Sequence, residues 1–543
     1  MVFARRSTTL LAAIIASCAM VLSLTACTSD NKTVVDGQTT VTSNSAGGVA
    51  VFTPSDGITL NQQMPLNKWA KLVPDLAKAL ADAGFKKGDI DHTTSDSLAK
   101  QSRAIQDFVV DHLSNNTTDD SGIAIAPDNM TLLVAPVVEA DASTRQYGDY
   151  ISQNLSTNDA TDGEATSDGE SSEDDSSKDD SSNTESDSTA SDEQAQAVDR
   201  LVSSLKLAKE SGMHVVLLGN SIEGYKPDAF VKFSDAQTIG KLQAEKMVSK
   251  LKLDKASKDN PKYIEVLLPY TAMDEKGNAN DSTFAQEAFR GIWQVLGSYY
   301  QKGVVESPSG TLDGKSTEND WQAVAYDAAK EGSTAKVLDK RLAKTDGQST
   351  LTRIDGIITM NDYIASEVVK ELDDLGYTGS AADINPQITI SGIVGNITGK
   401  KDLSRDAVPD PIKSPENDNA NDSSSSDDDA DEDTSASDKD RDSQWPLVTG
   451  YGAYVSNIPS IVNGKQWMTG MEDRQTIATD IAQACAKLNK DEALNSMPSI
   501  RNSEVGGVKK IPTINEPLLA VSAGNLKSAL IDPGYISLAD AGL

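Results

Sequence analysis

His214-Val-Val-Leu-Leu-Gly219 decides the fold class: it is a short, almost wholly apolar run ending in glycine, and the helical pattern Thr238–Leu251 follows it. Such a continuous apolar strand is typical of a parallel sheet covered on both faces. The same alternation extends in both directions along the chain. The predicted strands are Val49–Thr53, Thr131–Val137, His214–Gly219, Tyr263–Tyr270, Ile354–Thr359 and Gln387–Ile393, and the predicted helices are Lys68–Ala83, Ala197–Ser211, Thr238–Leu251, Phe284–Tyr300, Ile364–Leu375 and Thr476–Leu488. The sequence therefore predicts an α/β protein with right-handed crossovers.

The length of the chain, 543 residues, exceeds what one hydrophobic core supports, so we expect two sheets. Much of the net charge of −33 lies in two tracts: residues 156–193 hold 14 acids and one base, and residues 414–443 hold 12 acids and two bases. Such tracts have too little apolar area to fold, which predicts two disordered insertions. Cation binding is the alternative for both tracts. The sequence has no basic patch, which argues against nucleic-acid binding.

The N-terminus has the features of a secretory signal. Arg5 and Arg6 precede the apolar run Leu10–Leu24, which is too short to span a bilayer, and Leu24-Thr25-Ala26-Cys27 follows. This tetrapeptide resembles a bacterial lipobox. It predicts cleavage before Cys27 and lipidation of its thiol, and a diacyl anchor gives stable attachment to the membrane. The alternative is an ordinary cleavable signal in which the cysteine is incidental.

Residues known for catalysis or metal binding do not form a recognisable pattern in this sequence. His92, His112 and His214 are far apart, and Gly310–Ser316 is one residue shorter than a phosphate-binding loop. Cys485 lies in an apolar helical pattern, which indicates a small buried side chain. We therefore expect neither an enzyme nor a bound cofactor or metal. Ligand capture at the carboxyl ends of the strands is the function that remains.

Five short motifs resemble those of the type I periplasmic-binding-protein family, in its xylose or multiple-monosaccharide branch. They are Lys68-Trp69, the segment Phe230–Ala244, Asn361-Asp362, the "GKQxMT" motif at Gly464–Thr469, and Ile511–Leu519. The resemblance implies two Rossmann-like lobes with parallel sheets joined by three crossovers, the periplasmic binding protein-like I fold. It also implies that the protein captures a monosaccharide or similar small ligand on the extracytoplasmic face of the cell membrane and delivers it to an ABC transporter permease.

The resemblance also implies a division of the chain. The expected parts are a signal peptide at 1–26, a lipidated flexible tether at 27–48, the first lobe at 49–230, the second lobe at 231–393, a return to the first lobe at 394–505 and a return to the second lobe at 506–543.

Sugar recognition needs aromatic faces for the C–H side of the ring and charged or amide groups for the hydroxyls. The candidates implied by the resemblance are Lys68, Trp69, Asn220, Asp235, Trp321, Asn361, Asp362 and Asn396. Asp235 has the alternative role of capping a helix, and Trp321 that of a core residue. The chain departs from the family at Ser221, where arginine is usual, at Ile393-Val394, where Gln-Asp is usual, and at Glu472, where lysine is frequent. The alternative is therefore a surface sensor or scaffold that keeps the fold and binds a non-sugar ligand or none.

Overall fold

The computed structural model describes residues 33–35, 38–40, 46–55, 65–115, 125–138, 144–157, 185–273, 280–343, 351–381 and 444–543. The chain forms two compact units, Met1–Ser45 and Ala46–Leu543. In the first unit, β1 (Thr33–Val35) and β2 (Gln38–Thr40) form an antiparallel pair. Both strands lie within residues 27–48, for which the sequence predicts a tether.

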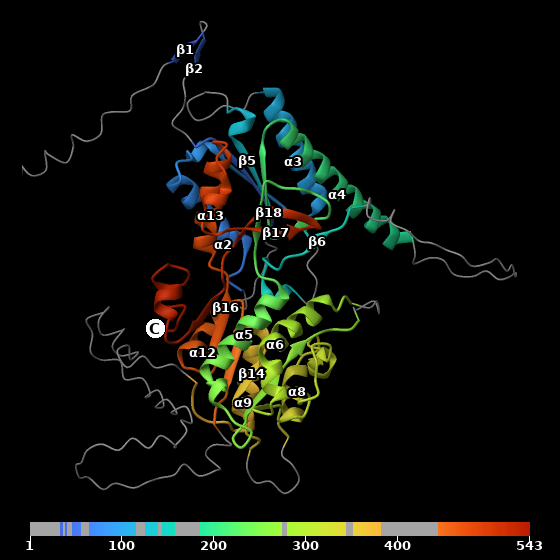
Figure 1. Ribbon diagram of the computed structural model, residues 1–543, viewed down its shortest axis with the longest axis vertical. Helices are drawn as coiled ribbons and strands as arrows, with labels where there is room; N and C mark the ends of the chain where they lie inside the picture. The colour runs from blue at the N-terminus through green and yellow to red at the C-terminus, as the bar shows by residue number, and fades with distance from the viewer. Residues whose placement is uncertain are drawn as a thin grey trace, which may run out of the picture. The chain divides into compact units, whose positions relative to one another are not determined.

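The first sheet of the second unit has the strand order β17-β18-β9-β7-β5-β3-β4. Its strands are β3 (Gly48–Pro54), β4 (Ile90–Ser95), β5 (Met130–Val134), β7 (His214–Leu218), β9 (Ala229–Lys232), β17 (Ile500–Val505) and β18 (Val508–Asn515), and its helices are α2 (Trp69–Asp82), α3 (Leu98–Asn115), α4 (Glu185–Glu210) and α13 (Arg474–Leu488). All neighbouring strands are parallel except β17 and β18. Val49 and Val51 pack in the core with α2 and α13, whereas Ala50 and Phe52 pack with α3 and α4. Side chains of β3 thus alternate between two covered faces. Figure 1 shows α2 and α13 on one side of this sheet and α3 and α4 on the other.

The second sheet has the strand order β12-β10-β14-β15-β16-β19 and is parallel except between β16 and β19. Its elements are β10 (Lys262–Val266), β12 (Val305–Glu306), β14 (Gly356–Ile358), β15 (Leu447–Tyr451), β16 (Met468–Met471), β19 (Leu519–Ser522), α5 (Ala236–Lys250), α6 (Thr283–Gln301), α8 (Ser333–Arg341) and α9 (Asp362–Leu375). Shorter elements are β6 (Asn154–Leu155) paired with β8 (Ser221–Ile222), β11 (Leu268–Pro269) paired with β13 (Ala325–Tyr326), α7 (Trp321–Val324) and α12 (Ile458–Val462). One hydrophobic core forms where this sheet packs against α5 and α6, and another where it packs against α8 and α9.

The chain passes between the two sheets three times, after β9, after β16 and after β18. The predicted α/β fold of two parallel sheets with three crossovers is therefore confirmed. The predicted boundaries of its later parts are wrong. Within the expected return to the first lobe at 394–505, β15 and β16 belong to the second sheet; within the expected return to the second lobe at 506–543, β18 belongs to the first. Backbone pairing decides this, since β15 pairs with β14 and β18 with β9.

The predicted acidic insertion at 156–193 ends too late, because α4 begins at Glu185. Cys27, the tract 414–443 and the predicted strand Gln387–Ile393 lie outside the described residues.

Cys485 is fully buried, as predicted, and burial raises the pKa of its thiol.

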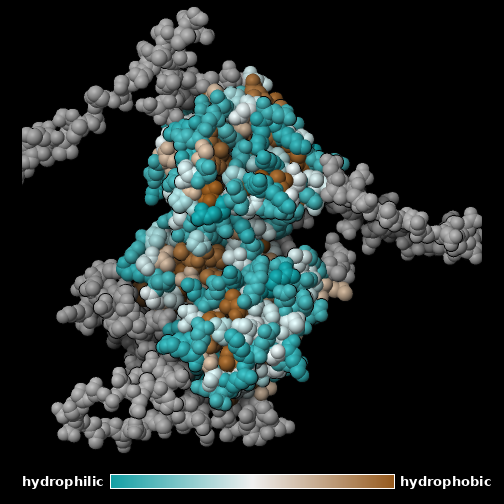
Figure 2. Space-filling model, viewed as in Figure 1, coloured by the Kyte–Doolittle hydropathy of each residue, from teal (hydrophilic) through white to brown (hydrophobic). Residues whose placement is uncertain are grey.

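Within the described part of the chain, no helix combines the length and apolarity needed to cross a bilayer. The visible face of the molecule is mostly hydrophilic (Figure 2).

Candidate functional site

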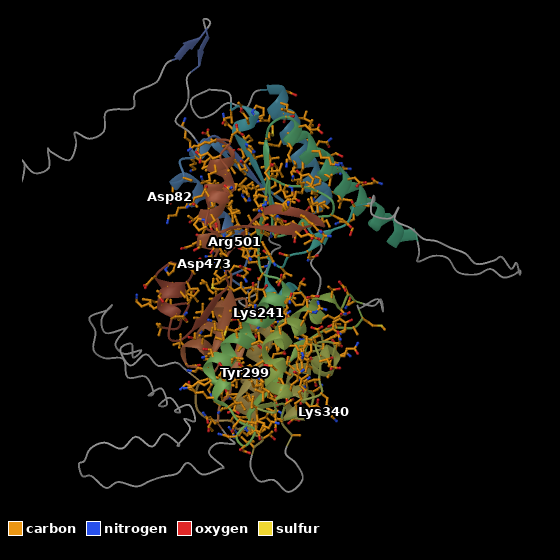
Figure 3. All side chains as sticks on the ribbon, viewed as in Figure 1. Asp82, Lys241, Tyr299, Lys340, Asp473 and Arg501 are labelled. Atoms are coloured by element: carbon orange, nitrogen blue, oxygen red, sulfur yellow. The ribbon has the colours of Figure 1, made fainter. Side chains whose placement is uncertain are left out.

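The carboxyl ends of the parallel strands of both sheets meet at the crossovers. Ser234, after β9, donates its backbone N–H to Glu472 Oε1 at 2.6 Å, and Glu472 follows β16. The Tyr451 hydroxyl, at the end of β15, lies 2.5 Å from Ser234 Oγ, and Asn67 Oδ1, before α2, accepts from Glu472 N at 3.3 Å. Asp473, beside Glu472, marks the start of α13 in Figure 3. Both sheets therefore contribute to one buried polar cluster. We call the region around Asn67, Ser234, Tyr451 and Glu472, where the strand ends of the two sheets meet, the junction.

Two buried carboxyls lie at this junction. Burial raises the pKa of Glu472 to about 7, although hydrogen bonds from Ser234 favour its charged form. Burial likewise raises the pKa of Asp362 to about 6. Asp362 accepts hydrogen bonds from Gln466 Nε2 at 2.7 Å, Thr469 Oγ1 at 2.9 Å and the backbone N–H of Tyr454 at 2.9 Å. The protein itself therefore supplies the donors for both carboxyls.

The backbone is strained where two strands of the second sheet end. Met360, after β14, has φ 69°, and Ala453, after β15, has φ 50°, and both are fully buried. Hydrogen bonds hold both turns: Gln243 Nε2 donates to the Met360 carbonyl at 3.0 Å, and the N–H of Ala453 donates to Thr469 Oγ1 at 3.1 Å. Non-glycine residues in this region carry strain, and such strain is concentrated at functional sites.

Lys68 and Trp69 lie at the amino end of α2, on the first-sheet side of the junction. Trp69 is 3 % exposed, and its ring makes edge contacts with Tyr150 at 5.1 Å and Phe233 at 5.6 Å. Lys68 Nζ lies 2.6 Å from Asp149 Oδ1. The structure thus brings these two predicted residues to the expected edge, where their contacts are with the protein.

Asn220 and Asp235 both have structural partners. Asn220 Oδ1 accepts from the N–H of Gln153 and its Nδ2 donates to the Pro136 carbonyl, both at 2.9 Å. Asp235 caps α5 by accepting from Thr238 N at 2.7 Å. Burial raises the pKa of Asp235, but its hydrogen bonds to Thr238 and Lys232 outweigh burial and lower it. The helix-capping alternative for Asp235 therefore agrees with the structure.

The other candidates lie on the second-sheet side or apart from it. Asn361 caps α9, since its Oδ1 accepts from Ile364 N at 2.9 Å, and its Nδ2 donates to Gln146 Oε1 at 3.0 Å. Trp321 is 9 % exposed and packs edge-on against Tyr270 at 5.1 Å in the second-sheet core, as its core alternative predicted. Asn396 lies outside the described residues.

One contributor to the junction was missed by the sequence analysis: the segment Thr144–Ile151, which follows β5. Its Tyr147 and Tyr150 are each 1 % exposed, and they belong to the cores of different sheets. The only signal in the sequence is the pair of tyrosines around Gly148-Asp149, in a chain whose aromatic content is 5 %.

The junction is a buried aromatic and amide-rich surface. Among the described residues, histidine, cysteine, aspartate and glutamate form no group of three or more that is suited to a metal ion. Aromatic rings come from Trp69 and Phe233 on one side and from Phe284 and Tyr451 on the other. Such a surface can hold a small polar ligand by ring stacking and hydrogen bonds.

No family model matches the chain, and no curated protein does. Similar solved structures include an ABC transporter solute-binding protein from Clostridium phytofermentans with bound β-D-glucose, at 17 % identity and a TM-score of 0.44, covering 91 % of this chain and 99 % of that one. A carbohydrate transporter solute-binding protein from Chloroflexus aurantiacus in complex with D-glucose has 18 % identity and a TM-score of 0.43, covering 92 % and 98 %. A sugar ABC transporter protein from Actinomyces odontolyticus has 10 % identity and a TM-score of 0.44, covering 89 % and 97 %.

Proposed function

We propose that this protein is an extracytoplasmic solute-binding lipoprotein that captures a sugar-like molecule between its two sheets and delivers it to an ABC importer permease. The observation that supports the proposal most is the meeting of the carboxyl ends of two parallel sheets joined by three crossovers. Ligands of open α/β sheets bind outside these strand ends. The lipobox-like sequence ending at Cys27 supports the part of the proposal that concerns the membrane.

The side chains at the junction suit a sugar. The face of an aromatic ring packs on the apolar C–H side of a pyranose, and Trp69 and Phe233 supply such rings. The amide of Asn361 and the carboxyl of Asp362 are groups that bond to hydroxyls. These residues define the site in which we place the solute.

A panel of monosaccharides at millimolar concentration tests the proposal by thermal shift. A bound ligand raises Tm by mass action, so at least one sugar is expected to stabilise the protein. The Trp69→Ala variant is expected to lose that stabilisation. The proposal fails if no monosaccharide stabilises either the wild type or a Tyr147→Ala/Tyr150→Ala variant, in which two buried rings are removed from the junction.

A second candidate function is a surface sensor or scaffold without sugar uptake. It is favoured by the internal partners of the candidate residues, since Asn220, Asp235 and Asn361 all bond to the protein itself. Deleting the gene and measuring growth on single sugars separates the two functions. Impaired growth on one particular sugar supports uptake, and unchanged growth on every sugar supports the sensor or scaffold.

A further inference from the structure

The segment Thr144–Ile151, here called the strap, is tied to the first sheet through two of its residues. The Tyr150 ring stacks on Phe233 at 4.7 Å, and its hydroxyl donates to the Lys68 carbonyl at 2.5 Å. Asp149 Oδ1 pairs with Lys68 Nζ at 2.6 Å, and its Oδ2 accepts from the N–H of Trp69 at 3.1 Å. The strap therefore uses the aromatic faces and the cation that the proposed site would offer to a solute.

The other half of the strap is tied to the second sheet. The Tyr147 ring lies 4.7 Å from that of Phe284 and 6.2 Å from that of Tyr451. Gln146 accepts twice: its Oε1 from Asn361 Nδ2 at 3.0 Å, and its carbonyl from the Tyr454 hydroxyl at 2.6 Å. One short peptide thus places an aromatic ring and polar contacts on each side of the junction.

The strap packs closely against Asn67, but it leaves one buried donor of that residue unpaired among the described residues. Gly148 has φ +98°, and a Cβ there would lie 2.5 Å from the Asn67 carbonyl oxygen, so only glycine allows this approach. Asn67 Nδ2 is buried and has no hydrogen-bond partner among the described residues. An unpaired buried donor costs about 1–3 kcal/mol. A ligand that satisfies this donor has an advantage over the strap.

We infer that the strap is an intramolecular ligand, which occupies the place where the proposed function puts the solute. The inference rests on the proposed function for the identity of that place. A free solute then binds only in the fraction of molecules whose strap has left, and its apparent affinity is reduced by that fraction. The strap therefore raises the concentration of solute at which half of the protein molecules are occupied.

A peptide supplied in trans tests the inference directly. The probe is the synthetic peptide Thr-Arg-Gln-Tyr-Gly-Asp-Tyr-Ile, which has the sequence of residues 144–151. It is titrated calorimetrically into the wild type and into the Tyr147→Ala/Tyr150→Ala variant. We expect saturable binding to the variant, and at least about tenfold weaker binding to the wild type, whose site is filled.

The matched control is Tyr225→Ala, which removes a buried tyrosine from the first-sheet core and leaves the strap intact. We expect Tyr225→Ala to bind the peptide probe as weakly as the wild type does. A peptide with alanine in place of both tyrosines should bind none of the proteins. Equal binding of the probe to the strap variant and the wild type, or no binding to the strap variant, overturns the inference.

Monosaccharide titrations separate this inference from the proposed function. We expect any sugar that binds to do so at least about tenfold more tightly to the strap variant than to the wild type. If the peptide binds the variant and no sugar binds either protein, the strap is an intramolecular ligand and the proposed function fails. If a sugar binds both proteins equally and the peptide binds neither, the proposed function stands and the strap inference fails.

Amide exchange in the wild type provides a test that does not depend on the folding of a variant. The Asp149 N–H donates to the Asn67 carbonyl at 2.8 Å in the strapped state. We expect its exchange to be slowed at least about 100-fold relative to an unstructured peptide. Exchange at the unstructured rate means that the strap does not occupy the site, and it overturns the inference.

Discussion

Glu472, which follows β16 at the second crossover, is expected to make the stability of the protein depend on pH. Burial raises its pKa to about 7 from an ordinary value of 4.5. The unfolded chain therefore loses this proton at lower pH than the folded chain does, so the stability contributed by Glu472 falls as pH rises from about 4.5 to about 7. The resulting loss in the free energy of unfolding is about 3 kcal/mol. We expect the wild-type Tm to fall between pH 5 and pH 8, and Glu472→Gln to reduce that fall, as measured by calorimetry.

Asp362, whose pKa is about 6, titrates with the same sign, so part of the fall remains in Glu472→Gln. Glu504→Gln changes an exposed carboxyl of β17 and serves as the control. The assignment to Glu472 is wrong if Glu472→Gln and Glu504→Gln lose the same amount of stability over this pH range.

Asp362→Ala tests the buried network in the second sheet. The substitution leaves the buried N–H of Tyr454 without its acceptor. It also removes the shorter hydrogen bonds of Gln466 Nε2 and Thr469 Oγ1, which keep only contacts of 3.2 Å and 3.3 Å with the carbonyls of Met468 and Gly470. Each unpaired buried donor costs about 1–3 kcal/mol, so we expect a loss of about 3 kcal/mol or more in urea unfolding. Asp373→Ala, which breaks an exposed pair with Lys465, should cost less than about 1 kcal/mol. Losses of similar size in the two variants would contradict the network.

The sequence predicted which residue types stand at the strand ends and could not predict their partners. Lys68, Trp69, Asn361 and Asp362 all lie at the junction, where their partners are other residues of the protein. In the sequence Glu472 stands out only as a departure from the family. In the structure it is the centre of the buried cluster, because Asn67 and Ser234 reach it from distant parts of the chain. Contacts over such separations depend on the topology, which no local pattern contains.

At the scale of the elements, α5 and α6 approach each other closely at two glycines. A Cβ on Gly291 would meet the backbone carbonyl of Gln237 in α5, and one on Gly240 would meet that of Ala288 in α6. Gly291→Ala is therefore expected to destabilise the protein by about 1–3 kcal/mol, although alanine favours a helix by about 1 kcal/mol. Ser298→Ala, at an exposed position of the same helix, should be neutral. Chemical denaturation measures both, and a stabilised Gly291→Ala variant would disprove the close approach.

Elements with regular periodicity were predicted, and elements without it were missed. Within the described residues, every predicted helix is present, because each has an apolar face on a sheet. The strand β4 was missed because its residues Asp91–Thr94 are polar and exposed, which its place at the edge of the sheet permits. The strands β15 and β16 were missed because they are short and contain glycine and threonine.

At the scale of the whole molecule, the three crossovers explain why the architecture could be predicted from the sequence, whereas the boundaries of its later parts could not. Local patterns distinguish strands from helices, but they do not distinguish one parallel sheet from another. That assignment depends on pairing between strands such as β14 and β15, which are separated by residues 382–443 outside the described part of the chain. The order of family-like motifs was therefore informative about fold class and uninformative about which sheet each late strand joins.

The proposed lipid anchor at Cys27 belongs to the scale of the whole molecule. We expect the wild type in the membrane fraction of its host and Cys27→Ala mostly in the soluble or secreted fraction, because the proposed anchor needs the Cys27 thiol and a diacyl group is enough for stable attachment. Cys18→Ala is a closely matched control, since Cys18 lies in the same signal and would be removed with it. Fractionation followed by immunoblotting and labelling with a radioactive fatty acid measures both location and lipidation. Label on Cys27→Ala, or its retention on the membrane at the wild-type level, would show that another feature anchors the protein, whereas loss of label from Cys27→Ala alone assigns the anchor to this one thiol.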